Sequence, residues 1–199
     1  MIELTKDQKN ELKDLYEALY NTREEIENRC RGKQKQQSIF TCQVGKKYAN
    51  AEIKFMLIGR CANGWEYFKP STPGRFAERY VSEFVGEKGA KEGFDWIEKK
   101  AGKQYSGTYN LQRSRFWTYS RSFFEKLTEE QKEQYTKSRI WQDHIVQSDL
   151  YKMSPAAGGN PGGKAIELQH DICLALLKKN RAIEANAYFV CNGCNVVIR

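Results

Sequence analysis

The sequence predicts an α/β fold in which helices cover a short parallel sheet. Three segments are predicted to be strands: 53–59, whose apolar residues in a row suit a strand buried on both faces, then 144–151 and 187–191. Segments with helical spacing separate them, and strands that alternate with helices form parallel sheets with helices on both sides. A chain of 199 residues can bury a core of its own, so we expect one domain, 1–199.

The first element is predicted to be a helix over residues 5–28. Thr5 and Gln8 have the spacing of a capping box, in which two side chains satisfy the first backbone N–H groups of a helix. Apolar residues recur on one face at helical spacing: Leu12, Leu15, Tyr16, Leu19 and Ile26. Charged residues populate the opposite face, as expected of a helix that packs on a core.

The stretch between the first and second strands is predicted to be a helical insertion. Residues 75–85 and 93–100 have helical spacing, and so do residues 113–127, where arginines alternate with aromatic residues. Such a pattern suits a surface that stacks on bases and binds phosphate. A core helix with its arginines in solvent explains most of these aromatic residues more simply. The Thr128–Gln131 spacing predicts a further short helix.

The first strand ends in a polar loop, 59–68, with aromatic residues beside it. Loops at the carboxyl ends of buried strands are where α/β proteins bind ligands. Asn63 can hold a water molecule or a base edge, and Glu66 can serve as a general base where it is partly buried. The alternative interpretation is that Asn63 and Gly64 form a simple Asn-Gly turn.

A second glycine-rich loop, 158–164, follows the second strand and fits the GxxxxGK spacing of nucleotide-binding loops. Its backbone N–H groups and Lys164 would surround a phosphate at the N-terminus of the next helix. Ala165 stands where a nucleotide-binding loop carries the hydroxyl that holds magnesium. We therefore favour a DNA phosphate as the ligand. A nucleotide binder and a plain surface loop are the alternatives.

The overall charge favours a polyanionic partner such as nucleic acid. The chain has 33 Lys and Arg against 25 Asp and Glu, a formal net charge of +8. Its opening residues do not have the character of a signal peptide, and no apolar run has the length of a membrane span. Six dispersed cysteines indicate reduced thiols inside a cell, and the CxxC at 191–194 lacks the second pair of a zinc site.

Several segments together resemble the uracil-DNA glycosylase superfamily, in particular its poorly characterised bacterial branch. They are CQVGKKY (42–48), FMLIGRCANGW (55–65), SDLYKMSP (148–155), GNP (159–161) and the strand 188–193. The resemblance implies a three-layer α/β/α sandwich around a four-stranded parallel sheet. It also implies a DNA-repair enzyme of the cytoplasm that binds single- or double-stranded DNA and flips a damaged base into a pocket. The glycosidic bond would be hydrolysed without a cofactor or metal.

The resemblance also implies roles for individual residues. Cys61 occupies the place of the family's water-positioning Asp or Asn, so that role passes to Asn63, two residues on. Asp149, or Ser148 one register back, occupies the place of the residue that reads the base edge, and an ionised aspartate only accepts hydrogen bonds. The remaining base-pocket residues would be Gly59, Cys61, Ala62, Tyr67, Phe68 and Ser148. The phosphate-binding residues would be Arg60, Ser154, Gly158, Gly159, Gly162, Gly163 and Lys164.

The family's second motif, a His-Pro or Asn-Pro loop after the third strand, is not found among residues 194–199. Either the chain is truncated or its activity is degenerate, which makes a non-catalytic nucleic-acid-binding protein of the same fold the alternative. A missing fourth strand would leave one sheet edge open. A partner or a second copy of the chain is expected to cover that edge.

Overall fold

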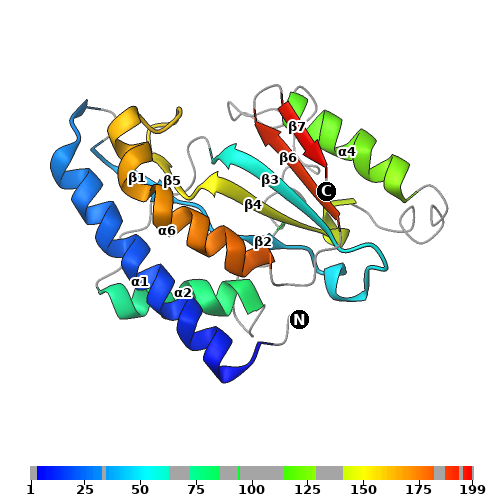
Figure 1. Ribbon diagram of the computed structural model, residues 1–199, viewed down its shortest axis with the longest axis horizontal. Coiled ribbons are helices and arrows are strands. Elements are labelled where there is room, and N and C mark those ends of the chain that lie inside the picture. Colours follow the sequence, from blue (N-terminus) through cyan, green and yellow to red (C-terminus); the bar gives the residue numbers. More distant parts are fainter. Residues whose placement is uncertain are drawn as a thin grey trace, which may run out of the picture.

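The computed structural model is a mixed α/β structure built on a five-stranded sheet (Figure 1), which confirms the predicted α/β class. It describes residues 4–32, 35–62, 72–85, 94, 114–128, 141–181, 187–192 and 195–198. The longer helices in these ranges are α1 (Lys6–Arg29), α2 (Pro73–Val85), α4 (Arg115–Leu127) and α6 (Gly163–Arg181). The strands are β1 (Gln37–Ile39), β2 (Gln43–Val44), β3 (Phe55–Cys61), β4 (Ile145–Tyr151), β5 (Met153–Pro155), β6 (Ala187–Asn192) and β7 (Asn195–Ile198).

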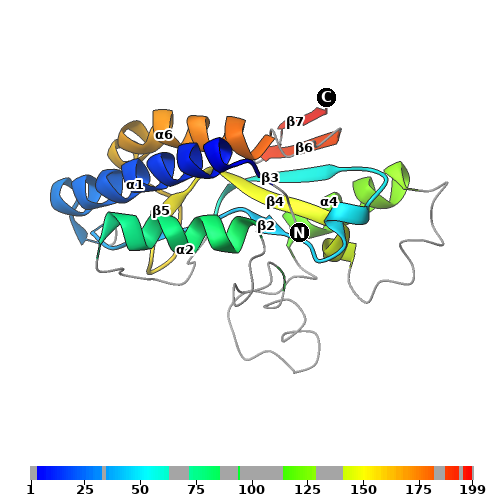
Figure 2. The ribbon, with the colours of Figure 1, turned by 90° about the horizontal axis from the view of Figure 1, so that it is seen from below.

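The three strands expected from the sequence form the centre of this sheet. The order is β2-β4-β3-β6-β7, and β3 pairs in parallel with both β4 and β6 (Figure 2). The edge strands β2 and β7 run antiparallel to their neighbours, so the prediction of an all-parallel sheet is wrong at both edges. Strands β1 and β5 form a separate antiparallel pair.

Strand β7 also corrects the expectation of an open edge beside the third strand. It pairs with β6 in a register that places Asn192 opposite Asn195 and Phe189 opposite Ile198. The chain itself therefore covers the edge of β6. A four-residue strand carries little periodicity of its own, and it is stabilised as a strand only by the neighbour with which it pairs.

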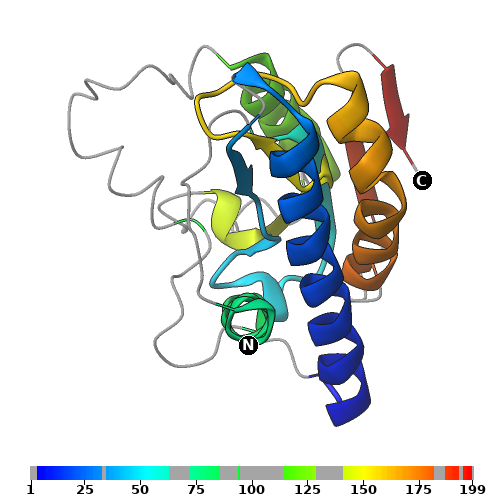
Figure 3. The ribbon, with the colours of Figure 1, turned by 90° about the vertical axis from the view of Figure 1, so that its left-hand side faces the viewer.

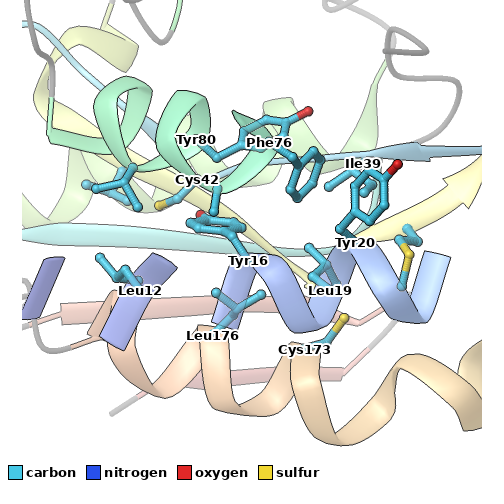
Figure 4. Close-up of a cluster of buried hydrophobic side chains, with 14 of the residues drawn as sticks. Leu12, Tyr16, Leu19, Tyr20, Ile39, Cys42, Phe76, Tyr80, Cys173 and Leu176 are labelled. Carbon is cyan, nitrogen blue, oxygen red and sulfur yellow. The ribbon is translucent and has the colours of Figure 1, made fainter. Parts of the chain in front are cut away.

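Helix α1 begins and packs as its sequence predicts. The Thr5 hydroxyl accepts a hydrogen bond from the Gln8 backbone N–H at 3.2 Å, and the Gln8 side-chain oxygen accepts one from the Thr5 N–H at 2.9 Å. The helix lies between α2 and α6 (Figure 3). Its Tyr16 ring stacks on Tyr80 of α2, with 5.6 Å between centroids, in the apolar cluster shown in Figure 4.

Alternate residues of β3 contact different groups of helices, because successive side chains of a strand point to opposite faces. Met56 and Ile58 belong to the cluster formed with α1, α2 and α6. Phe55 and Leu57 pack in a second cluster with Trp117 and other aromatic residues of α4. Burial of the α4 aromatic residues agrees with the core-helix interpretation of residues 113–127.

Two of the expected helices cannot be compared with the structure. Of residues 93–100, the structure describes only Phe94, which is buried. The stretch that follows Thr128 also lies outside the described residues. None of the helices in the described ranges has the combination of length and apolar character that is needed to cross a bilayer.

Candidate functional site

The candidate site lies where β3 and β4 end side by side. Their register places Gly59 opposite Asp149 and Cys61 opposite Tyr151. The connection that leaves β3 includes α2, in the cluster of α1 and α6, and then α4, which packs on the Phe55 face, whereas the connection that leaves β4 includes α6. Ligands of α/β proteins bind outside the carboxyl ends of parallel strands, which is where Gly59 and Asp149 lie.

The Asp149 side chain lies in the space that the lack of a side chain at Gly59 leaves on the neighbouring strand. The Asp149 side chain is buried, with 2 % of its surface exposed. A β-carbon on Gly59 would lie within 3.0 Å of Asp149 Oδ1 and 3.4 Å from the Phe116 ring. The carboxyl group therefore occupies the space that any side chain at position 59 would need. The absence of a β-carbon at Gly59 is what allows Asp149 to lie against β3.

The charge state of Asp149 is unusual for a carboxyl group. Burial raises the pKa of Asp149 from its usual 3.8 to about 7, and the nearby Lys152 ammonium opposes part of that rise. Protonated and ionised forms are therefore both populated near neutral pH. A protonated carboxyl donates a hydrogen bond as well as accepting one, which removes the restriction expected for an ionised aspartate at this position.

One oxygen of the Asp149 carboxyl has no hydrogen-bond partner in the described part of the chain. Oδ2 is fully buried, and among the described residues it meets no donor. Leaving a buried polar group unsatisfied costs about 1–3 kcal/mol. Buried polar groups without a partner are uncommon, and together with a shifted pKa they mark a place where a ligand group can bind.

Ser148 faces away from Asp149, although both were expected to face the base. Val146 packs with α1 and α6, and Ser148, two residues on, lies on the same face of β4. Its hydroxyl accepts hydrogen bonds from Lys152 Nζ at 2.5 Å and Asn180 Nδ2 at 3.4 Å. The structure therefore does not bring Ser148 and Asp149 together on one face of the sheet.

The end of β3 contacts the segment that follows β4, so the two predicted loops do meet. Cys61 Sγ donates a hydrogen bond to Asn160 Oδ1 at 3.3 Å, and the Ser154 hydroxyl donates to the Ala62 carbonyl oxygen. Ser154 is buried, and its hydroxyl makes this internal contact, which a phosphate would have to replace. Burial, and then the charge of Asp149, raises the pKa of Cys61 to about 11, so the thiol is neutral.

The glycine-rich loop has the backbone that its sequence requires. Gly158 and Gly159 have φ angles of 89° and 102°, in the left-handed region that residues with a β-carbon rarely adopt. Gly162 precedes α6, which begins at Gly163. The exposed Lys164 pairs with Glu167 of the same helix at 3.0 Å. Solvent-exposed pairs contribute little stability, so this lysine can exchange its partner for a phosphate at small cost.

The described residues do not cover the whole candidate site. Asn63, Tyr67 and Phe68, which were predicted to position water and to stack on the base, lie outside the described residues, as does Glu66. Arg60 is described and is exposed at the end of β3. The site as described thus consists of Asp149, the end of β3 and the glycine-rich loop.

Two functional candidates were not found from the sequence. Lys152 appears in the sequence only within the segment 148–155 and has no predicted role, yet it is buried directly behind Asp149. Phe116 was assigned to a helix face, yet its ring lies beside Gly59. No periodicity indicates either role, because both depend on which strands and helices become neighbours.

Comparison with known proteins gives no relative from which to transfer a function. No protein-family model matches the chain, and no curated protein and no solved structure matches it either.

Proposed function

We propose that this protein is a DNA-base N-glycosidic hydrolase that flips a damaged base into a pocket at the carboxyl ends of β3 and β4. The observation that carries the proposal is the Asp149 carboxyl, which is buried against Gly59 and has one oxygen without a partner among the residues that the structure describes. A flipped base is read through hydrogen bonds to its edge, and flipping costs a few kcal/mol. A buried acceptor without a partner is suited to that contact.

The pKa of about 7 is consistent with a base that offers both a donor and an acceptor, as uracil does. In its protonated form, Asp149 donates to a base carbonyl. In its ionised form, it accepts from a base N–H. In the proposed mechanism, Asn63 positions the attacking water, and Tyr67 or Phe68 stacks on the base. The family likeness behind these roles also entails a three-layer α/β/α sandwich, which the helices on both faces of β3 support.

The DNA backbone would be held beside this pocket. Lys164, at the N-terminus of α6, and Arg60, at the end of β3, provide positive charge for one or two phosphates. The contact between Cys61 and Asn160 ties this loop to the end of β3. The net charge of +8 favours the same partner.

A base-release assay tests the proposal. Wild-type protein is incubated with single- and double-stranded oligonucleotides that contain uracil, and free base is measured. We expect release by the wild type, a loss of about 100-fold or more for Asp149→Leu, and no change for the control Asp171→Asn, an exposed residue of α6. The isosteric Asp149→Asn keeps donors and an acceptor at every pH. It should retain release and lose the pH dependence near 7.

The alternative, a non-catalytic nucleic-acid-binding protein of the same fold, predicts a different pattern. DNA binding that weakens with salt, without release of base from any of the oligonucleotides, would contradict the enzymatic proposal. Equal release by wild type and Asp149→Leu would show that Asp149 does not read the base.

A further inference from the structure

A buried lysine lies behind Asp149, on the opposite face of β4. Only 1 % of the Lys152 surface is exposed. Its Nζ donates one hydrogen bond to the Ser148 hydroxyl at 2.5 Å and another to the Asp149 backbone carbonyl at 2.6 Å. Asn180 of α6 donates to the same Ser148 hydroxyl. The lysine thus contacts the main chain of Asp149 rather than its carboxyl.

Lys152 donates to the Asp149 carbonyl in place of the backbone N–H that a neighbouring strand would supply. Strand β2 pairs with β4 at Val146 and Gln147 only, so its ladder ends before Asp149. Buried carbonyl groups require a donor, and Lys152 supplies it. The lysine therefore holds the backbone of the residue whose carboxyl lies against Gly59.

Few ionisable groups face this lysine. They are the thiols of Cys42, next to β2, and Cys173 on α6, together with the Asp149 carboxyl. Burial raises the pKa of Cys42 to about 12 and that of Cys173 to about 11, so both thiols stay neutral. Cys61, which faces Asp149 from β3, is also neutral. Among the described residues, Asp149 is therefore the group near Lys152 that ionises close to neutral pH.

The charges of Lys152 and Asp149 influence each other through β4. Burial lowers the pKa of Lys152, and the negative charge of Asp149 opposes that change. Equally, a positive charge on Lys152 favours the ionised form of Asp149. Because linkage is reciprocal, the free energy by which Lys152 stabilises the ionised Asp149 equals the free energy by which Asp149 stabilises the charged Lys152.

We propose that Lys152 is a positioning residue that sets the protonation of Asp149 from the far side of β4, and so determines whether Asp149 donates or accepts a hydrogen bond at the base edge. This inference rests on the proposed role of Asp149 in reading the base. It adds a determinant of specificity that does not touch the base. With Lys152 charged, both forms of the Asp149 carboxyl are present near neutral pH, and the pocket can accept as well as donate a hydrogen bond. Without that charge, it stays protonated to higher pH and favours a base carbonyl.

The titration of Asp149 in the free full-length chain tests the coupling. The carboxyl carbon is followed by ¹³C NMR from pH 4 to 10 and assigned with Asp149→Asn. We expect its midpoint to rise by about one to three pH units in Lys152→Gln, which keeps an N–H donor, and in Lys152→Met, which keeps none. The control Lys178→Met removes an exposed lysine of α6 and should leave the midpoint unchanged.

A reciprocal measurement needs no change at Lys152. The Lys152 ε-carbon, labelled with ¹³C, should titrate at a lower pH in Asp149→Asn than in the wild type, by an amount equal to the Asp149 shift. This second variant keeps the inference testable where the Lys152 variants fail to fold. An unchanged Asp149 midpoint in folded Lys152→Gln, or an unchanged Lys152 midpoint in Asp149→Asn, overturns the inference.

Base release then separates this inference from the proposed function. In Lys152→Gln, the pH at which uracil release falls by half should move up in parallel with the Asp149 midpoint. A shifted midpoint in a protein that releases no base contradicts the proposed function alone. Normal release with an unshifted pH profile and an unshifted midpoint contradicts the role of Lys152 alone.

Discussion

The fit between Gly59 and Asp149 leads to a quantitative prediction for Gly59→Ala. The added β-carbon would lie within 3.0 Å of Asp149 Oδ1, closer than such atoms approach other groups in real structures, and 3.4 Å from Phe116. The carboxyl belongs to a short side chain in a central strand, so it has little freedom to move aside. Either Asp149 changes rotamer or the two strands separate.

The expected cost follows from two opposing effects. Overpacking of a filled core costs about 1–3 kcal/mol. Alanine also restricts the unfolded chain, which offsets about 0.4–1 kcal/mol of that cost. We therefore expect Gly59→Ala to lower the free energy of unfolding by about 1–2 kcal/mol, measured by urea denaturation.

Two further variants isolate the cause. Gly163→Ala is the matched control, because a β-carbon there would meet no atom within 4 Å, and it should be neutral or slightly stabilising. In an Asp149→Ala background, the cost of Gly59→Ala should fall by at least about 0.5 kcal/mol, since the clashing oxygen is gone. An unchanged cost in that background, or none in the wild type, would refute the proposed fit.

Three other predictions concern the same region and its neighbours. Gly45→Ala should cost more than Gly59→Ala in the same urea experiment, because its β-carbon would meet backbone carbonyl oxygens, Asp143 among them, which cannot rotate away. As the pH rises from about 4 to 7, the free energy of unfolding of the wild type should fall relative to that of Asp149→Asn, by up to about 1.4 kcal/mol per pH unit. The reason is that the folded protein keeps a proton on Asp149 that the unfolded chain has lost. A parallel pH dependence of the two proteins would contradict burial of that carboxyl. Lys164→Gln should weaken DNA binding and reduce by about 1 the steepness with which the logarithm of the binding constant falls with the logarithm of the salt concentration. The control Lys178→Gln should change neither. Weaker ATP binding with unchanged DNA binding would favour a nucleotide-binding loop instead.

Several features of the fold could be predicted because they depend on local pattern. The capping box of Thr5 and Gln8 involves residues three apart, and both of its hydrogen bonds form. Residues 55–58 of β3 are apolar in a row and buried, as the residues of a central strand are. The glycines at 158 and 159 are required by their φ angles wherever the loop lies.

The edges of the sheet could not be predicted in the same way. Strands β2 and β7 contain two and four residues, and each is defined by its pairing with a neighbour. The sequence favoured an open edge at β6 because so short a segment has no periodicity to detect. Pairing is a property of two segments at once, and a pattern within one segment does not contain it.

The sequence by itself determined which segments become helices and central strands, that the chain is basic, and that two glycine-containing loops follow strands. The tertiary structure decided which side chains of those loops share a site. It placed Asp149 against Gly59, turned Ser148 to the other face, committed Ser154 to an internal hydrogen bond and buried Lys152 behind the carboxyl. The physical reason is that charge state and hydrogen bonding depend on burial and on neighbours that only the packed structure brings together: Ser154 and Ala62 are 92 residues apart in the chain, and Gly59 and Asp149 meet only because their strands pair.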